Sequence, residues 1–364
     1  MRVTVQPCKL KKVVFRCILK RDFKEKQAFM NSDKINFADV KENQLLHLDK
    51  EILTQLLKDC TTDKNILWCT DNYKKYGSKY EKNQQITIDL ITFNNGNVIK
   101  PRIEKNKQEQ QQRIRDKAEV FTPSWVCNAQ NNLIDNDWFG RENVFNTEKE
   151  AERTWVTNHE KIVFPDKDGR RWKDYVEGNR LEITCGEAPY VTSRYDTVSG
   201  NYIEVPDRAG FLDRKLRVVT ENTTGEEEWL KWAYTAVQSS YAFEWQGDNL
   251  LIARENLLFS VKEYFEYFFK KSLETKHLIE LAKIISWNVW QMDGLKFVVP
   301  ESCKNEKKEA DTCFLFEEMF TEGETCECEG CKKGDNFKHN GLYCKIMDWK
   351  ENKTVRYVDV FGKK

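Results

Sequence analysis

The sequence lacks long apolar runs, an excess of charge of one sign, internal repeats and low-complexity segments. No stretch approaches the ~18 consecutive apolar residues that a bilayer-spanning helix requires, so we expect no transmembrane segment and no membrane partner. Charges run through the apolar stretch of residues 1–24, which argues against a signal peptide and favours a cytoplasmic location. The 59 basic and 59 acidic residues cancel, so a site for a polyanion would have to be a local patch.

The twelve cysteines are mostly scattered, but a group near the C-terminus lies close together. Its pattern is C-x2-C-x7-H-x4-C, which has the ligand types and the spacing of a closed tetrahedral zinc site. The segment is rich in lysine, glycine and asparagine, so apolar burial alone could hardly fold it. We therefore predict a structural zinc ion bound by Cys328, Cys331, His339 and Cys344. Cys326 is an alternative ligand, and two more cysteines are expected to lie outside the site, Cys303 and Cys313.

The length of 364 residues allows more than one domain, and composition divides the chain into four parts. We predict a β-rich accessory region at 1–101, a polar linker helix at 102–119, a cofactor-binding core at 120–302, and a cysteine-rich segment with final strands at 303–364. In the accessory region, candidate strands at 2–6 and 12–19 precede a helix at 49–58. An Asn-Gly turn then predicts a β-hairpin over 86–103.

The linker at 102–119 is polar on all sides and contains three arginines, Arg102, Arg113 and Arg115. A solvated helix is the favoured interpretation, and a helix that contacts phosphate groups is the alternative.

From about residue 180 onward, strand-like and helix-like stretches alternate, which predicts an α/β fold with a parallel sheet covered by helices. The candidate strands are 180–185, 241–246 and 284–291, and the candidate helices are 226–240, 248–269 and 273–287. The helix at 226–240 places apolar residues on one face, which we expect to be core: Trp229, Trp232, Ala233, Ala236 and Val237.

Four short motifs occur in order along the chain, at the predicted ends of strands or at turns. They are FTP at 121–123, LEITCGE at 181–187, FEW at 243–245 and WQMDGL at 290–295. In a doubly wound fold the ligand lies at the carboxyl ends of parallel strands, where glycine lets the main chain approach a cofactor closely. The acid in FEW is then placed for ribose hydroxyls, and the aspartate in WQMDGL is placed for an adenine amino group.

In their order and kind these motifs resemble the adenine-specific DNA methyltransferases of restriction-modification systems. Stand-alone proteins of the type called restriction endonuclease subunit M share longer stretches with this chain, such as RDKAEVFTPSWVCNAQNNLID and IISWNVWQMDGLKFVVP, over most of residues 95–355. The resemblance implies a Rossmann-like class I methyltransferase core with S-adenosylmethionine as cofactor. It also implies methyl transfer to the exocyclic amino group of adenine in DNA, with a specificity or nuclease subunit as a possible partner.

The resemblance further implies roles for the matching residues. Phe121 and Thr122 would contact the methionine end of the cofactor, and Glu182, Cys185 and Gly186 would form the turn beneath it. Carboxylates around a positively charged sulfonium would favour the charged cofactor over its neutral product.

Two acids at later strand ends complete the implied site. Glu244 would bind the ribose hydroxyls, and Asp293 would accept from the adenine amino group. Glu244 follows Glu182 by 62 positions, whereas a dinucleotide fold expects its ribose acid about 20 residues on. Either an insertion at about 195–225 separates them, or Glu244 is misassigned.

The methyltransferase family grips its target base with an Asn/Asp/Ser-Pro-Pro-Tyr/Phe/Trp motif, which this chain lacks, because none of its seven prolines is followed by another. The best substitute is Asp348 and Trp349, which would polarise the amino group and stack on the base. The same two residues could instead close a structural strand. Alternative functions are a catalytically impaired DNA- or partner-binding subunit and a half-enzyme completed by another chain. We assign no DNA cleavage to this chain, since the sequence offers no Asp…Glu-x-Lys cluster that we would defend as a nuclease site.

Overall fold

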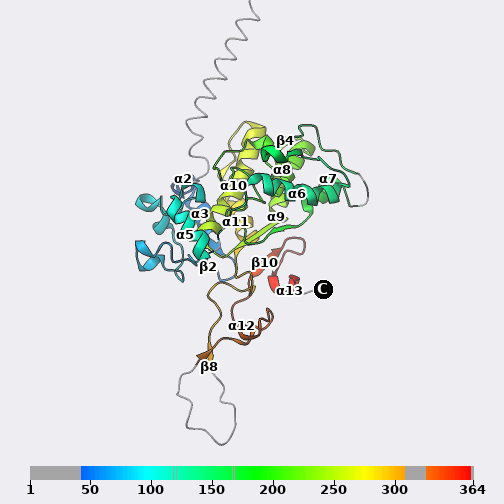
Figure 1. The fold of residues 1–364 in the computed structure, drawn as a ribbon. Helices are drawn as coiled ribbons and strands as arrows, with labels where there is room; N and C mark the ends of the chain where they lie inside the picture. The colour runs from blue at the N-terminus through cyan, green and yellow to red at the C-terminus, as the bar shows by residue number, and fades with distance from the viewer. Residues whose placement is uncertain are drawn as a thin grey trace, which may run out of the picture.

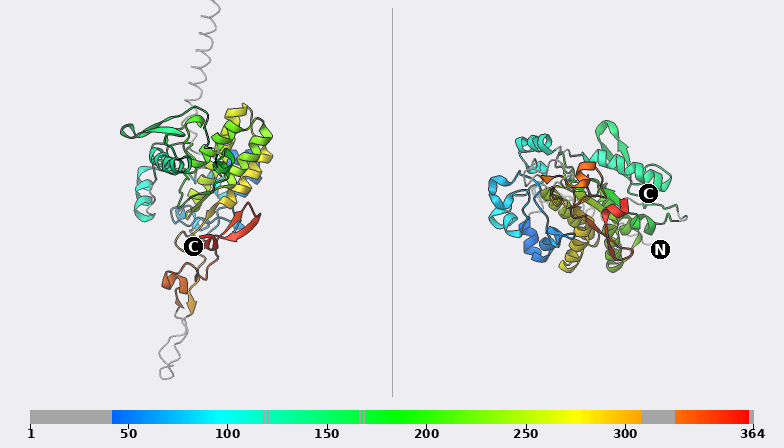
Figure 2. Two further views of the ribbon diagram at one scale, coloured as in Figure 1. Left: turned by 90° about the vertical axis from the view of Figure 1, so that its right-hand side faces the viewer. Right: turned by 90° about the horizontal axis from the view of Figure 1, so that it is seen from below.

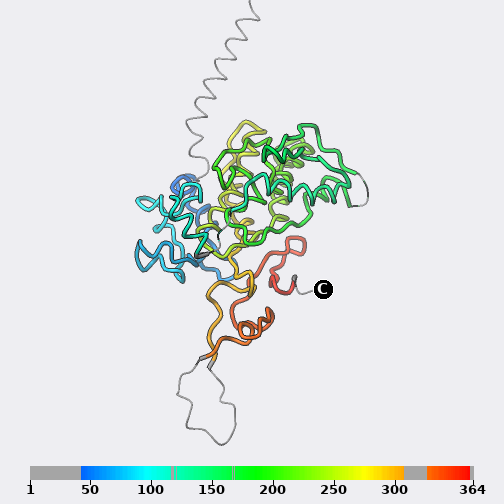
Figure 3. The backbone as a smooth tube through the Cα atoms, in the orientation of Figure 1, coloured from blue at the N-terminus to red at the C-terminus, as the bar shows by residue number. Residues whose placement is uncertain are grey.

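The computed structural model describes residues 42–117, 119, 121–165, 167, 169–307 and 325–361. The strands expected at 2–6 and 12–19, as well as Cys313, lie outside the described residues. The fold mixes helices with small sheets, and the C-terminal segment extends from a larger, mainly helical body (Figures 1 and 3). Among the described helices, none has both the length and the apolar character that crossing a membrane requires.

A three-stranded parallel sheet, with strand order β5-β6-β7, lies within the main body. The strands are β5 (Arg180–Glu182), β6 (Ser240–Glu244) and β7 (Val289–Gln291). In this register Glu182 lies opposite Ala242, and Glu244 lies opposite Gln291. The parallel arrangement agrees with the predicted alternation of strands and helices.

Four helices that follow β5 in the sequence form much of the apolar core with this sheet. They are α8 (Phe211–Asn222), α9 (Glu226–Gln238), α10 (Gly247–Phe269) and α11 (Thr275–Asn288). The predicted core face of α9 is confirmed, because all five of its expected residues are buried. Two helices, α8 and α9, lie between β5 and β6, which accounts for the long spacing between Glu182 and Glu244.

The strand predicted at 284–291 is wrong in its first half, because α11 continues to Asn288 and only 289–291 is extended. Ile284 and Ile285 continue the buried face of α11 that begins at Leu278, two turns earlier, and includes Leu281, one turn earlier. Helical spacing of apolar side chains therefore overrides the strand preference of the isoleucines.

The described part of the N-terminal region is helical rather than β-rich. Its first helices are α2 (Glu42–Leu48) and α3 (Lys50–Leu57), and the Asp49 side chain caps α3 by accepting from the Glu51 N–H at 2.8 Å. The predicted helix at 49–58 is thereby confirmed, and its buried face packs against α11. The two strands in this part, β1 (Lys58–Asp59) and β2 (Lys64–Asn65), form a short antiparallel pair.

The β-hairpin predicted over 86–103 is wrong. A short helix, α4 (Ile88–Ile91), and a 3-10 turn, η4 (Phe93–Asn95), occupy this stretch. The Asn95 side chain donates to the carbonyl of Asp89 at 2.9 Å, and the Asn43 side chain accepts from the Phe93 N–H at 2.7 Å. A local side-chain bond from Asn95 and a long-range one to Asn43 thus replace the strand pairing that the Asn-Gly turn suggested.

The polar linker forms the helix α5 (Lys107–Lys117), as predicted. It is followed by α6 (Ser124–Phe139), an antiparallel hairpin of β3 (Asn146–Lys149) and β4 (Thr154–Thr157), and then α7 (Trp172–Glu177). The hairpin projects from the body in the left-hand view of Figure 2.

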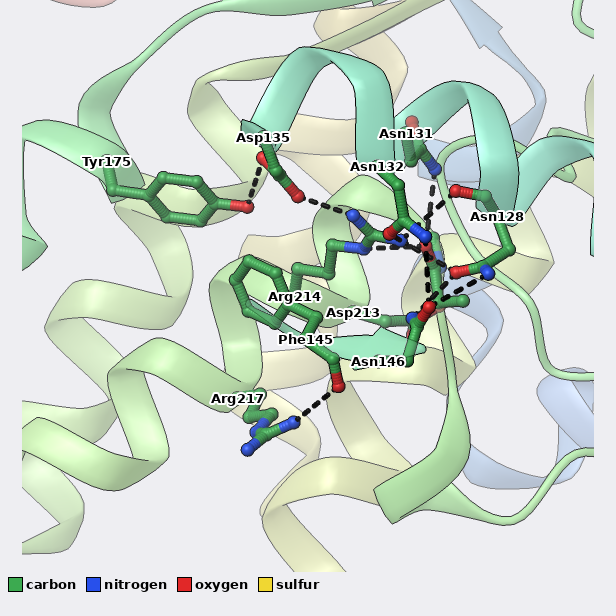
Figure 4. Close-up of polar contacts among 12 residues, drawn as sticks. Asn128, Asn131, Asn132, Asp135, Phe145, Asn146, Tyr175, Asp213, Arg214 and Arg217 are labelled. Atoms are coloured by element: carbon green, nitrogen blue, oxygen red, sulfur yellow. Dashed lines mark hydrogen bonds and ion pairs between the residues drawn. The ribbon is translucent and has the colours of Figure 1, made fainter. Parts of the chain in front are cut away.

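A buried polar network joins α6 to α8 (Figure 4). The Arg214 guanidinium of α8 donates to the Asp135 carboxylate of α6. It also donates to the side-chain oxygens of Asn128 and Asn132, both at 2.8 Å. Asp135 accepts a further bond from Arg180, the first residue of β5, so the network reaches the sheet. Opposite charges and hydrogen bonds offset the cost of burying these groups.

The C-terminal segment contains short elements and a small apolar cluster of its own. The elements are β8 (Glu306–Lys307), β9 (Thr325–Cys326), α12 (Glu329–Lys333), β10 (Lys345–Asp348), β11 (Lys353–Arg356) and α13 (Tyr357–Phe361). Ile346 and Tyr357 pack with Phe243 of β6 and Trp290 of β7. This cluster attaches the segment to the sheet.

The Asp135 network gives a prediction about stability. Asp135→Asn leaves two buried guanidinium groups without their counter-charge, so we expect it to lower the free energy of unfolding by about 3–5 kcal/mol. The matched control is Asp137→Asn, an exposed position on the same helix, with an expected change within about 0.5 kcal/mol. Urea unfolding measures both, and equal effects of the two substitutions would contradict a stabilising role for the network.

Candidate functional site

A cavity of about 930 Å³ lies at the carboxyl ends of β5 and β6. Residues from three separate parts of the sequence line it, and they include six of the seven predicted cofactor-binding residues: Phe121, Thr122, Glu182, Cys185, Gly186 and Glu244. The structure therefore brings together the FTP, LEITCGE and FEW motifs. Despite its 62-residue separation from Glu182, Glu244 lies beside the Gly186 turn.

The turn after β5 has an unusual main-chain conformation. Thr184, Gly186 and Ala188 have φ angles of 46°, 55° and 61°, in the left-handed region that side chains with a Cβ disfavour. A Cβ on Gly186 would also lie 3.5 Å from the ring of Phe121. The glycine thus lets the main chain turn tightly and bring its N–H groups to the end of the sheet.

Glu244 lies under this turn and is 7% exposed. One of its carboxylate oxygens accepts from the Gly186 N–H at 2.9 Å, and the other accepts from the Gln246 N–H at 3.1 Å. Burial raises the pKa of Glu244 to about 7, although these two hydrogen bonds act in the opposite direction. This carboxyl group therefore changes its charge near neutral pH.

Glu182, the last residue of β5, is equally buried and accepts from the Val191 N–H at 3.0 Å. Burial holds its pKa well above the ordinary value, and the nearby Glu244 raises it further. Burial also raises the pKa of the Cys185 thiol well above its usual range. At neutral pH the floor of the cavity therefore combines a neutral Glu182 and a neutral Cys185 with a Glu244 that is near its midpoint of titration.

Phe121 and Thr122 form part of the opposite wall. The Arg102 guanidinium lies 5.1 Å from the centroid of the Phe121 ring, and the Thr122 carbonyl accepts from the Thr197 hydroxyl at 3.1 Å. The Asp196 carboxylate accepts from the Ser124 N–H at 2.7 Å and so fixes the start of α6 directly after the FTP motif. The wall is therefore held by contacts from two neighbouring loops.

Asp293 is the predicted cofactor residue that the structure does not bring to this cavity. It lies in a turn after β7, where its carboxylate accepts from the Leu295 N–H at 3.0 Å and lies 3.7 Å from the Lys296 ammonium. Its side chain is satisfied within that turn, and it is not among the residues that line the cavity.

Asp348 and Trp349, the predicted catalytic residues, do not line the cavity that holds the predicted cofactor-binding residues. The Trp349 indole N–H donates to the Asn288 side chain at 2.7 Å, and Asn288 immediately precedes β7, at the amino end of the sheet. Asp348 accepts from the Lys350 and Glu351 N–H groups and thereby shapes the turn between β10 and β11. Both residues line another cavity, of about 710 Å³, and the alternative of a structural strand end is the better description.

No family model, curated protein or solved structure matches this chain. What the cavity can do is therefore judged from its geometry and its chemistry.

Sequence reasoning missed a buried ionic cluster beside the cavity. Asp248, in the first turn of α10, accepts from Arg113 of α5 and from the Tyr73 hydroxyl, both at 2.7 Å. Lys105 lies 3.4 Å from the same carboxylate, and these cations hold the pKa of Asp248 well below its usual range. Arg113 is only 5% exposed. It therefore fits neither interpretation of the linker, because a solvated helix would expose it to water and a phosphate-contacting helix would leave it free to bind phosphate.

The signal for this cluster was the charge pattern around the FEW motif. Asp248 follows Glu244 by four positions and precedes the apolar, buried run at 250–253 of α10. A charged residue there needs a buried partner, but the sequence does not indicate that this partner is Arg113, which lies 135 positions away.

A second site holds three cysteines and one histidine near the C-terminus, and it could bind a metal ion. The ligand atoms of Cys303, Cys328, Cys331 and His339 all lie within 4.8 Å of one another. The three sulfur atoms lie 3.8, 3.7 and 3.6 Å from His339 Nδ1, in that order. Three of the four predicted ligands are thus brought together.

The fourth ligand differs from the prediction, because Cys303 takes the place of Cys344. Cys344 is fully buried in the apolar cluster beneath the sheet, where its thiol donates to the Gln291 carbonyl at 3.4 Å. Cys326 belongs to β9 and is not part of the group either. Spacing alone could not distinguish Cys303 from Cys344, since both can complete a C-x2-C hook with a histidine.

The raised pKa of Glu244 predicts a pH dependence of stability. The folded state binds the proton more tightly than the unfolded state, whose glutamate has its ordinary pKa near 4.5. This contribution to the free energy of unfolding is complete below pH 4.5 and is lost as pH rises to about 7. We expect the loss to be about 3 kcal/mol.

Urea unfolding of wild type and Glu244→Gln from pH 5 to pH 8 measures this loss. As pH rises, the free energy of unfolding of wild type should fall relative to that of Glu244→Gln. The difference between the two proteins should level off above about pH 7. A difference that does not change with pH would show that Glu244 titrates normally.

Proposed function

We propose that this chain binds S-adenosylmethionine in the cavity at the ends of β5 and β6. We further propose that it acts as an adenine-specific DNA methyltransferase of the restriction-modification type. The observation that carries the proposal is the convergence of the FTP, LEITCGE and FEW motifs on one cavity. The parallel pairing of β5 and β6 accounts for the proximity of LEITCGE and FEW, and the approach of FTP from outside the sheet to the same cavity is what supports a shared ligand.

The dimensions and the chemistry of the cavity fit this cofactor. Its volume of about 930 Å³ is within the range of sites for small molecules. Phe121 and Trp245 supply flat apolar surface, and Glu182 and Glu244 supply acceptors for hydroxyl and ammonium groups. The position of the ligand at the carboxyl ends of parallel strands is the one that open α/β sheets favour.

The buried acids would discriminate by charge. S-adenosylmethionine, when bound, supplies a methyl group on a positively charged sulfonium. A cation in the cavity lowers the pKa of Glu182 and Glu244, because the opposite charge compensates for their desolvation. Cation binding is therefore linked to proton release from this chain, and it becomes tighter as pH rises toward the pKa of Glu244 at about 7.

A second candidate function is a cofactor-binding subunit that transfers no methyl group by itself. Two observations favour it: the chain has no two consecutive prolines, and Asp348 and Trp349 lie at the amino end of the sheet. Turnover on DNA by the purified chain would exclude this candidate. Cofactor binding without turnover would support it.

We also propose that the Cys303 group binds zinc. With zinc–sulfur bonds of about 2.3 Å and zinc–nitrogen bonds of about 2.0–2.1 Å, a tetrahedral ion separates its ligand atoms by roughly 3.6 Å. The distances of 3.6–3.8 Å to His339 Nδ1 agree with that geometry. The ion would link Cys303 to the helix α12. It would thereby close a loop of the chain between them.

The first prediction concerns cofactor affinity. Titration calorimetry should show S-adenosylmethionine binding to wild type about tenfold more tightly at pH 8 than at pH 6, with release of about one proton at the lower pH. Glu244→Gln should bind more weakly at pH 8 and lose this dependence, because its amide cannot become an anion.

The matched control is Glu227→Gln, which removes an exposed acid from α9 and should behave as wild type. Absence of binding at both pH values would refute the proposed function. Binding that is equal in wild type and Glu244→Gln would place the cofactor elsewhere.

The second prediction distinguishes the two sets of zinc ligands. Purified wild type should contain one equivalent of zinc, and Cys303→Ser should lose most of it, because serine is a poor zinc ligand. Cys344→Ser and Cys326→Ser should retain the metal. Metal content by mass spectrometry gives the answer, and loss in Cys344→Ser with retention in Cys303→Ser would restore the ligand set predicted from spacing.

A further inference from the structure

We infer that a third cavity, of about 460 Å³, binds the phosphate group of a nucleotide unit, which is either free or part of a nucleic-acid strand. The cavity lies between the segments 71–76 and 97–113. The inference goes beyond the proposed function and does not depend on it. It follows from two buried donors that lack acceptors, from the charge around the cavity and from an aromatic ring that lines it.

Arg113 separates this cavity from the cofactor cavity. It lines the cavity of about 460 Å³, and its Nη2 donates to the side-chain oxygens of Asn249 at 3.3 Å and Gln246 at 3.5 Å. Both acceptors line the cofactor cavity, and no described residue lines the two cavities together. They are therefore distinct sites.

The Lys105 ammonium is a buried donor with too few acceptors. Its side chain is 7% exposed, and its one hydrogen bond to the described residues, to Asp248 Oδ2, is long at 3.4 Å. The same oxygen already accepts from Arg113 and from the Tyr73 hydroxyl, both at 2.7 Å. Since an ammonium group has three donors, Lys105 can donate to a ligand while Asp248 keeps its two shorter bonds.

A second buried donor belongs to Asn72, which lines the same cavity. Its side-chain Nδ2 is buried and donates to no acceptor among the residues that the structure describes. A buried donor without an acceptor is costly, so an acceptor bound in the cavity would recover this free energy. Two such donors in one cavity, one of them an ammonium group, favour an anionic acceptor.

The two segments that form the cavity are basic, although the whole chain is neutral. Ten basic and four acidic residues lie in 71–82 and 97–115. Three of the basic residues pair with acids from other parts of the chain, Asp248, Glu119 and Glu301, and an excess of positive charge remains. The cavity therefore lies in a local basic patch, as a phosphate-bearing ligand requires.

The charged side chains that line the cavity are Lys75, Lys100, Lys105, Arg113, Asp71 and Glu109. Lys75 and Glu109 pair with each other at 3.0 Å, and both are largely exposed. Asp71 is also exposed, so water screens its charge. Lys100 has no acidic partner in the described ranges of the chain, and its charge is available to the ligand.

The Tyr76 ring suits the cavity to a nucleotide unit rather than to a bare anion. Tyr76 lines the cavity and is 48% exposed, and its ring stacks on that of Tyr73 with the centroids 6.5 Å apart. An exposed aromatic face beside a basic patch is a platform on which a base stacks, whatever its sequence. The volume of about 460 Å³ is within the range of sites for small molecules.

Titration calorimetry of the full chain tests the inference. Thymidine monophosphate should bind to wild type, inorganic phosphate should bind more weakly because it lacks the ring, and thymidine should not bind. Lys100→Gln and Asn72→Ala should each weaken binding of the monophosphate by about tenfold, because each removes a donor to the phosphate. The matched control is Lys79→Gln, which removes the same charge from the same basic segment outside the cavity and should bind as wild type.

A short single strand of oligothymidylate shows where the phosphate comes from. Tighter binding of the strand than of the monophosphate, with an affinity that falls as salt rises, would identify a nucleic-acid strand as the source. Tighter binding of the monophosphate would identify a free nucleotide. In both cases Lys100→Gln must weaken the binding.

Three results overturn the inference. The first is that no phosphate-bearing probe binds wild type. The second is that Lys100→Gln and Lys79→Gln lose affinity equally, which would mean that only the general charge of the segment matters. The third is that S-adenosylmethionine displaces the monophosphate, which would place both ligands in the cofactor cavity.

Discussion

The burial of two carboxyl groups at the ends of neighbouring parallel strands is the constraint on which the rest of the structure depends. Glu182 and Glu244 are each 7% exposed, and burial disfavours their charged forms. Main-chain N–H groups offset part of this cost, and the one from Gly186 reaches Glu244 because the turn after β5 enters the left-handed region. The parallel pairing of β5 with β6, the strained turn after β5 and the cavity therefore depend on one another.

The same end of the sheet also anchors the N-terminal part of the described chain. Asp248 is fully buried four residues after Glu244, and it is neutralised by Arg113 and Lys105 from the linker. A buried carboxylate without these cations would be costly, so the linker helix is fixed against α10. Arg113 also donates to Glu119, which lines the cavity, so the wall of the cavity depends on contacts from outside the core.

The sequence was most informative where one periodic pattern dominated. The buried face of α9 and the carboxyl ends of β5 and β6 were predictable, because apolar spacing and strand-terminal motifs are local signals. Asn95-Gly96 misled, since bonds from nearby side chains decided that turn. Cys303 and Cys344 were indistinguishable by spacing, and only the apolar packing of Cys344 beneath the sheet separates them. The position of Asp348 depended on long-range packing, which no local pattern encodes.

The most direct test of the account is to find where the cofactor lies. Ultraviolet irradiation of the chain with methyl-tritiated S-adenosylmethionine, followed by peptide mapping, labels the residues that contact it. The account predicts saturable labelling, displaced by unlabelled cofactor, within 119–122, 182–190 or 244–249. Saturable labelling confined to any other segment, or no saturable labelling, would contradict it.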